Sequence, residues 1–314
     1  MRIIFAGSGE FGLPALRALR DSGHAIVQIY SQPDRPAGRG RKLTPTPIAQ
    51  YAIDENLPIV RTADINKENL PAADVLIVIA FGQKIAPHVV DHARYGAINL
   101  HASLLPKYRG AAPIHWAILN GETITGNSVI RLAQKMDAGA VLAQSQVQIG
   151  ELETTGELHD RLAQDGPFLI LNVLAQMEQG TLIETPQDES QATLAPKLSR
   201  ETSLIDWTRP AVEIARQIRG LYPWPGCRVK LMRDDEQIAQ LTLVRARAIR
   251  TDSPHATPGR DVVIPGTITP TGSIATGEGL IEIVEVHPEG KRPMPLHDFT
   301  NGRPWGAGML LVSI

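Results

Sequence analysis

The start of the chain alternates between elements in a way that restricts the fold to the α/β class. Residues 2–6 form a short apolar run that Gly7 closes, which is typical of a buried strand. Apolar residues recur at helical spacing over residues 11–22, and residues 25–30 form a second apolar run. Two consecutive strands joined by a helix run parallel. We therefore predict a βαβ unit within a mostly parallel sheet.

The turn inside this unit carries glycines at the spacing of a dinucleotide-binding site. Gly7, Gly9 and Gly12 give the pattern GxGxxG between a strand and a helix. Binding of NAD also needs an acidic residue near the end of the second strand, and here the first acid, Asp34, follows Pro33 in the next loop. We interpret the glycines as a tight turn and predict no NAD cofactor. An NAD-dependent oxidoreductase is an alternative that rests on this turn alone.

Two later apolar runs lead to polar residues at one edge of the predicted sheet. Residues 74–80 are apolar on both faces, which indicates a central strand. The next strand runs into Asn99, His101 and Ser103, whose side chains share one face because strand side chains alternate. Three polar groups on one face are costly in a core, and Pro106 takes the chain out of the sheet. Ligands of open α/β sheets bind beyond the carboxyl ends of the strands, so we predict a functional site here.

A long basic loop, residues 34–43, follows the second strand. Connections in such units usually have about 2–6 residues, so this one is unusually long. Its cations are Arg35, Arg39, Arg41 and Lys42. We predict an extended, flexible arm that contacts the phosphate backbone of a nucleic acid. The alternative is an ordinary solvated surface loop.

Composition narrows the classes of protein that remain. Lys and Arg number 31 against 33 Asp and Glu, so a nucleic-acid partner must be read from a local patch. One cysteine, Cys227, excludes an internal disulfide and a cysteine-based metal site. No apolar run is long enough to span a membrane. Because the first strand begins at once, we expect no targeting peptide and a cytosolic protein.

The composition and the type of predicted element change after a long amphipathic helix predicted over residues 157–179. Residues 181–206 are rich in Pro, Thr, Ser and Gln, and short alternating β segments with Gly- and Pro-rich turns follow. We predict a Rossmann-like catalytic domain at residues 1–180, a linker at 181–206, and a small OB-like antiparallel β-barrel at 207–314.

The polar motif resembles that of the folate-dependent formyltransferases. Asn99 and His101 precede Ser-Leu-Leu-Pro, and Asp137 lies beside Gly139 further along. The basic loop is similar to that of the branch of the family that formylates methionyl-tRNA, and the resemblance covers essentially the whole chain. It implies transfer of a formyl group from 10-formyltetrahydrofolate to the amino group of methionyl initiator tRNA. It implies a C-terminal domain that holds tRNA and no metal, and we expect a monomer.

The resemblance also implies roles for individual residues. Asn99, His101 and Asp137 would be catalytic: the first two donate hydrogen bonds to the tetrahedral oxyanion, and Asp137 orients His101 and raises its pKa. A free α-amine titrates near pH 8, so no nucleophilic side chain is needed. The predicted folate-binding residues are Ser103, Leu104, Leu105, Pro106, Gly82, Gln83 and Ile85. The predicted tRNA-binding residues are Arg35, Arg39, Arg41 and Lys42.

Two further alternatives share part of this pattern. A formyltransferase that acts on a sugar or nucleotide amine has the same core motif, but the basic loop argues against it. A non-catalytic tRNA-binding protein would explain the basic loop and the barrel. It would leave Asn99, His101 and Asp137 without a role.

Overall fold

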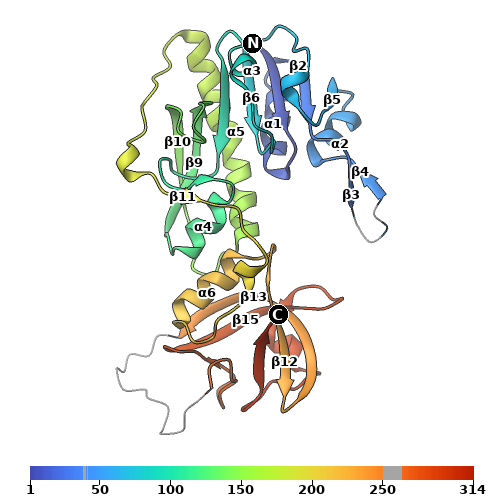
Figure 1. Cartoon of the computed structure of the whole chain (residues 1–314), viewed down its shortest axis with the longest axis vertical. Coiled ribbons are helices and arrows are strands. Elements are labelled where there is room, and N and C mark those ends of the chain that lie inside the picture. The colour runs from blue at the N-terminus through green and yellow to red at the C-terminus, as the bar shows by residue number, and fades with distance from the viewer. Residues whose placement is uncertain (38–39, 41, 250–263) are drawn as a thin grey trace. The chain divides into compact units, whose positions relative to one another are not determined.

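The computed structural model of the chain describes residues 1–37, 40, 42–249 and 264–314 (Figure 1). These residues form two compact units. Unit 1 contains Met1–Pro113, Ile124–Gln148 and His159–Ala195. Unit 2 contains Ile114–Thr123, Ile149–Leu158 and Pro196–Ile314. Two short segments of the chain therefore belong to unit 2 before residue 196, where the chain enters that unit and stays in it to residue 314. The predicted domain boundaries at residues 180 and 206 stay a prediction.

A seven-stranded sheet forms the centre of unit 1, in the order β10-β9-β7-β6-β1-β2-β5. The strands are β1 (Arg2–Gly7), β2 (Ala25–Ser31), β5 (Ile59–Arg61), β6 (Val75–Ile79), β7 (Ala97–His101), β9 (Ile124–Arg131) and β10 (Val141–Gln148). Strands β5, β2, β1, β6 and β7 run parallel, and β9 and β10 are antiparallel additions at one edge. The predicted mostly parallel, Rossmann-like sheet is confirmed. All residues of β6 are buried because it lies in the middle of the sheet.

The helices of unit 1 connect these strands. They are η1 (Glu10–Gly12), α1 (Leu13–Asp21), α2 (Pro47–Asp54), η2 (Ile65–Lys67), α3 (Pro87–Val90) and the part of α5 (Thr155–Gln179) that follows residue 158. Helix α2 begins at a cap that the sequence encodes, because Thr46 Oγ1 accepts from the amide of Ala49 at 3.1 Å and Pro47 follows it. None of the helices in the described residues is both long and apolar enough to cross a membrane.

The basic loop contains more regular structure than the sequence indicated. Its two ends form β3 (Arg35–Ala37) and β4 (Lys42–Thr44), which pair antiparallel and project as a narrow arm (Figure 1). The prediction of a loop without regular structure is therefore wrong at these ends. Backbone pairing needs no apolar side chains, and charged residues are common on isolated edge strands. Arg39 and Arg41 lie outside the described residues.

The segment after α5 returns to the strands of unit 1. Strand β11 (Leu194–Ala195) pairs parallel with β8 (Arg109–Gly110), and Thr185 forms an isolated β-bridge to Val141. A short helix η3 (Glu189–Gln191) lies between these two attachments. The first part of the predicted linker therefore adds structure to unit 1.

Unit 2 is built around a curled antiparallel sheet in the order β14-β15-β13-β12-β17, with β16 beside β15 (Figure 1). Its strands are β12 (Cys227–Arg233), β13 (Glu236–Ile249), β14 (Ile274–Ala275), β15 (Leu280–Pro288), β16 (Met294–Pro295) and β17 (Leu310–Ser313), and its helices are α4 (Pro113–Leu119), η4 (Glu201–Ser203), α6 (Ala211–Gly220) and α7 (Leu296–Thr300). This confirms the predicted small β domain of OB-like type. Thr267 and Ile268 add isolated bridges to Leu310 and Ile274.

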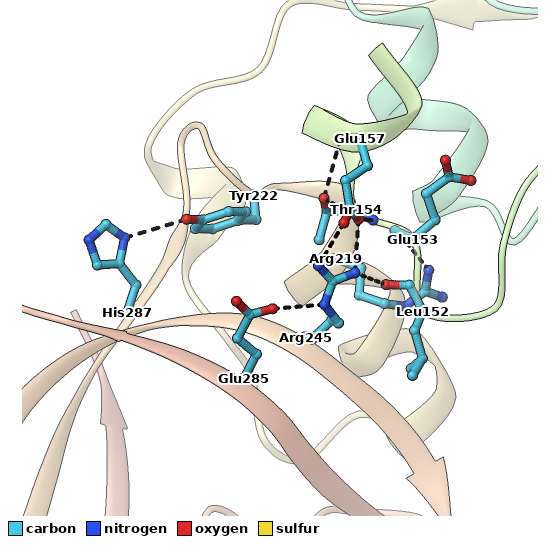
Figure 2. A network of polar contacts seen from close by, with 9 residues as sticks. All are labelled: Leu152, Glu153, Thr154, Glu157, Arg219, Tyr222, Arg245, Glu285 and His287. Atoms are coloured by element: carbon cyan, nitrogen blue, oxygen red, sulfur yellow. Dashed lines mark hydrogen bonds and ion pairs between the residues drawn. The ribbon is translucent and has the colours of Figure 1, made fainter. Parts of the chain in front are cut away.

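Arg245 of β13 is the centre of a network of polar contacts in unit 2. Figure 2 shows Arg245, which donates to both carboxylate oxygens of Glu157 and to the carbonyl of Leu152, each at 2.8 Å. Its Nε donates to Glu285 Oε2 on β15, also at 2.8 Å. Arg219 of α6 donates to the carbonyl of Glu153 at 3.0 Å. These bonds hold residues 152–157 against the sheet and helix of unit 2.

Candidate active site

Strand β7 carries the two polar residues that the sequence singled out. Its residue Asn99 lies opposite Val78 of β6 and Ile130 of β9, and His101 lies opposite Ser128 of β9. Alternation along the strand turns Asn99 and His101 to one face and Leu100 to the other.

On the reverse face Leu100 meets α5. A Cβ atom on Gly166 would lie 2.5 Å from Leu100 Cδ2, so the helix approaches the sheet at a residue without a side chain. Asn127 of β9 shares this face and donates to the carbonyl of Leu162 at 2.8 Å and to Asp165 at 2.9 Å. Helix α5 therefore covers the Leu100 face, and the polar pair lies on the other.

The structure brings His101 and Asp137 together, as the motif implied. Their Nδ1 and Oδ2 atoms are 3.7 Å apart, and the side chain of His101 is only 7% exposed. Its Nε2 lies 2.9 Å from the carbonyl of Tyr108, and that nitrogen is the donor because a carbonyl only accepts. The amide of Gly110 donates to Asp137 Oδ2 at 2.8 Å. One imidazole is thus held between a backbone carbonyl and a carboxylate.

Asn99 completes the group with an amide that is available for a ligand. The residue is half-buried, and its side chain has no hydrogen-bond partner among the residues that the structure describes. An amide contributes two N–H donors and a carbonyl acceptor. In the part of the chain with known placement, no cluster of three or more His, Cys, Asp or Glu side chains could hold a metal ion.

The Ser-Leu-Leu-Pro loop, residues 103–106, is fixed by two side chains from the antiparallel strands. Ser128 Oγ donates to the carbonyl of Ser103 at 2.6 Å and accepts from the amide of Leu105 at 3.1 Å. Gln144 Nε2 donates to the carbonyl of Leu105 at 2.9 Å. The hydroxyl of Ser103 is itself fully buried and donates to the carbonyl of Lys107 at 2.7 Å. Ser103 therefore shapes the loop through its side chain, Leu105 is buried, and Leu104 and Pro106 are half-buried.

The second predicted folate segment follows β6 at the same sheet edge. Gly82 has a φ of +76°, which favours glycine, and a Cβ there would lie 2.6 Å from Gln32 Nε2. The amide of Gln83 is engaged by the fold, since it accepts from the amide of Ile65 at 2.9 Å and donates to the carbonyl of Thr62 at 2.7 Å. Ile85 packs against a buried apolar cluster. The folate roles of these residues and of residues 103–106 stay predictions.

The base of the arm touches this same segment. Arg35 Nη2 donates to Gln32 Oε1, and Gln32 Nε2 donates to the carbonyl of Phe81 at 2.8 Å. Asp34 pairs with Arg61 at 2.8 Å. Arg35 and Lys42 are exposed, so both predicted cations that the structure describes face solvent.

Three residues of the site escaped the sequence reasoning. Tyr108 and Gly110 act through backbone atoms, which leave no mark on residue type. Gln187 donates to the carbonyls of Asp137 and Gly139 at 2.7 and 2.8 Å, although it lies in the predicted linker. In the sequence Gln187 is one polar residue among many in this segment, so nothing near it distinguished it as part of the site.

Known proteins and protein families are similar to this chain along most of its length. Residues 1–174 match the family described as formyl transferase, and residues 197–304 match its C-terminal domain. A curated methionyl-tRNA formyltransferase of Acidobacterium capsulatum is 41% identical over 311 residues, and one of Methylococcus capsulatus is 39% identical over 309; each alignment covers 96% of both chains.

Solved structures share the fold at low identity. An N-formyltransferase from Helicobacter canadensis, in complex with folinic acid and dTDP-3-aminofucose, has a TM-score of 0.64 and 16% identity over 89% of this chain and 97% of its own. HypX from Aquifex aeolicus, in complex with tetrahydrofolic acid, has a TM-score of 0.60 and 18% identity over 96% of this chain, which spans 47% of HypX. Given the two family matches and the identity to the curated relatives, this chain belongs to the formyl transferase family.

Proposed function

We propose that this chain transfers a formyl group from 10-formyltetrahydrofolate to the amino group of methionyl initiator tRNA. Relatives at 41% and 39% identity are named for this activity, and a structural neighbour holds tetrahydrofolic acid. The observation that carries the chemistry is the pair of His101 and Asp137 beside the unpartnered amide of Asn99. All three lie at or near the carboxyl edge of the sheet, where ligands of such folds bind.

The reaction needs charge stabilisation more than a nucleophilic side chain. The amine nitrogen attacks the formyl carbon, a C–N bond forms, and the carbonyl oxygen takes the negative charge. The bond from that carbon to N10 then breaks, its electron pair goes to N10, and N10 gains a proton as the former amine loses one. Asn99 would donate to the oxyanion. His101 would join it by exchanging the Tyr108 carbonyl at Nε2 for the oxyanion, with Asp137 at Nδ1 as its counter-ion.

The folate donor would bind between the two segments that flank the catalytic residues. The Ser-Leu-Leu-Pro loop is rigid, since Ser128 and Gln144 satisfy its backbone. The segment at residues 82–85 is fixed by Gln83 on one side and Gln32 on the other. Rigid backbone of this kind suits a flat heterocycle with several donors and acceptors.

The arm would select RNA as the amine carrier. Arg35 and Lys42 are exposed on β3 and β4, and the arm begins where β2 ends, at the same sheet edge as Asn99. Lys and Arg that contact phosphates strengthen binding by releasing counterions. The second candidate is a sugar N-formyltransferase, because the Helicobacter canadensis structure with an amino sugar has a similar fold.

A formylation assay with four acceptors separates these functions. We expect fast transfer to methionyl initiator tRNA and little to methionyl elongator tRNA, free methionine or a dTDP-amino sugar. Preferred transfer to the amino sugar would refute the proposed acceptor. Absence of transfer to any of the four, with folate binding intact, would refute the activity.

The remaining expectations are part of the same proposal. We infer a cytosolic monomer with a catalytic domain at residues 1–180, a linker at 181–206 and a tRNA-binding domain at 207–314. The reaction would use no metal and no NAD. Light scattering at micromolar concentration, titration with NAD and activity after chelation test these points one by one.

A further inference from the structure

Residues 185–193, within the predicted linker, lie next to residues 134–139, which we call the Asp137 loop. Thr185 is attached to Val141 by two backbone hydrogen bonds of 2.8 and 2.9 Å. Thr193 is attached by its carbonyl to the amide of Arg109 at 2.9 Å and by its hydroxyl to the amide of Tyr108 at 2.8 Å. Gln187 lies between these two anchors, so its backbone is held on both sides.

The side chain of Gln187 uses its full hydrogen-bonding capacity. Its Nε2 donates to the carbonyls of Asp137 and Gly139 at 2.7 and 2.8 Å. Its Oε1 accepts from Arg109 Nε at 3.0 Å and from Arg109 Nη2 at 2.7 Å. An amide has two N–H groups and two lone pairs, and all four have partners here. The reverse orientation would place the oxygen against two carbonyls and the NH₂ group against a guanidinium, so the orientation of the amide is determined.

The Asp137 loop needs such support because its backbone is strained. Asp137 has a φ of +51°, a left-handed conformation that is uncommon and less favourable for residues other than glycine. Gly139 passes so close to β9 that a Cβ would lie 1.9 Å from the carbonyl of Arg131. The loop is thus pinned at Gly139 by packing and at Asp137 by Gln187.

The contacts of Gln187 also close a ring around Asp137. Arg109, on the oxygen side of Gln187, precedes Gly110, whose amide donates to Asp137 Oδ2 at 2.8 Å. The side chain of Arg109 is 3% exposed and pairs with Glu189 at 2.8 Å. Both the carbonyl and the carboxylate of Asp137 are therefore fixed by one connected set of residues.

We propose that Gln187 is a positioning residue that sets the orientation of Asp137 toward His101 and acts on formyl transfer through Asp137. The proposal rests on the proposed function. The four hydrogen bonds of the Gln187 side chain go to Asp137, Gly139 and Arg109, and not to His101 or the residues predicted to bind folate, so we expect its effect to be confined to the step that Asp137 serves. A misplacement of about 1 Å of a catalytic group costs up to roughly 10²-fold in rate.

Replacement by glutamate tests the donor half of this contact alone. Gln187→Glu keeps an acceptor for Arg109 but sets a carboxylate oxygen against the two carbonyls of the loop. We expect kcat to fall about 10- to 100-fold with the KM values for the folate donor and tRNA unchanged. Gln187→Ala should give a similar loss if the glutamate variant folds poorly. The matched control is Gln191→Glu in the same segment, since the side chain of Gln191 is exposed and donates to Asp188 at 2.8 Å, away from the Asp137 loop; it should behave as wild type.

A double mutant separates positioning from general destabilisation. If Gln187 acts through Asp137, adding Gln187→Glu to Asp137→Asn should lower kcat no further than Asp137→Asn alone. An undiminished second penalty, or an equal loss in Gln191→Glu, would overturn the inference while leaving the proposed function intact. Near-normal turnover of Asp137→Asn would overturn the assigned role of Asp137 and the inference with it.

Discussion

Replacing Glu157 by glutamine should destabilise unit 2 through the loss of a single charge. Glu157 Oε2 accepts from the amide and hydroxyl of Thr154 at 2.9 Å each, and Arg245 binds both of its oxygens. Glutamine has the same shape and can occupy this position of a helix N-terminus, so the change isolates the ion pair. The variant thus tests the network of Figure 2 without disturbing the start of α5.

The magnitude follows from the carboxyl pKa. Arg245 first, and then the amide and hydroxyl of Thr154, lower the pKa of Glu157 from its ordinary 4.5 to about 2. At about 1.36 kcal/mol per pKa unit this is roughly 3 kcal/mol, an upper bound. The Glu157 side chain is 48% exposed, and solvent screens such pairs to about 1 kcal/mol or less where both partners are exposed. Because Arg245 is only 22% exposed, we expect about 1–2 kcal/mol at pH 7.

The sign of the pH dependence is fixed by the direction of that pKa shift. The folded carboxyl has the lower pKa, so its stabilising contribution is complete above pH 4.5 and is lost as the pH falls toward about 2. Urea unfolding at pH 7 should therefore separate wild type from Glu157→Gln. The two curves should converge as the pH approaches 2.

The only cysteine gives a local assay for this effect. Cys227 in β12 is fully buried, and burial raises the pKa of its thiol to about 12, so it reacts only when unit 2 opens. Glu157→Gln should speed thiol labelling at pH 7 by about 5- to 30-fold. Glu213→Gln is the control, because Glu213 in the first turn of α6 pairs with Arg209 just before that helix, and both side chains are exposed. Equal labelling of wild type and Glu157→Gln would refute the reasoning, as would an equal effect of the control.

Three further predictions concern the site. Asp137→Asn should lower kcat by about 10²-fold and leave folate affinity intact, measured by steady-state kinetics and titration. Ser128→Ala removes the partner of a carbonyl and an amide of the Ser-Leu-Leu-Pro loop, a loss of about 1–3 kcal/mol, and should raise the KM for the folate donor while Ser128→Thr does not. Replacing Arg35 and Lys42 by alanine should flatten the salt dependence of tRNA use by up to about two units without changing folate affinity, and an unchanged slope would make the arm an ordinary surface.

The elements that the sequence predicted correctly are those whose pattern of residue types is compatible with a single secondary structure and a single pattern of burial. Residues 75–79 are apolar on both faces, and a strand between two others buries them in that way, as β6 does. The alternation of Asn99, Leu100 and His101 likewise predicted which side chains share a face. In both places the information is local, within one strand.

The contacts that were not predicted depend on which strands pair with one another and on residues that are far apart in the sequence. The carbonyl of Tyr108 and the amide of Gly110 reach the site because β8 pairs with β11, and no side chain records that pairing. Gln187 lies 50 residues from Asp137 along the chain. The two strands of the predicted arm were missed for a related reason, since they are held by backbone pairing and carry charged residues in place of an apolar pattern.

The reverse face of β7 supplies a last prediction about how the site is held in place. Gly166 lets α5 approach Leu100, which lies between Asn99 and His101 and is 4% exposed. In Gly166→Ala the new Cβ would lie 2.5 Å from Leu100 Cδ2, and the buried leucine has no solvent to move into. The substitution also favours the helix by up to about 1 kcal/mol, so overall stability should change little.

We expect the clash to be relieved at β7, with a fall in kcat of about tenfold. Leu100→Val removes the atom that clashes and keeps a residue that strands favour. The double variant Gly166→Ala, Leu100→Val should therefore recover most of the kcat that Gly166→Ala loses, because the two changes are coupled by contact. Kinetics of the two single variants and the double variant measure this directly. A double variant as slow as Gly166→Ala would mean that Leu100 does not transmit the position of α5 to Asn99 and His101.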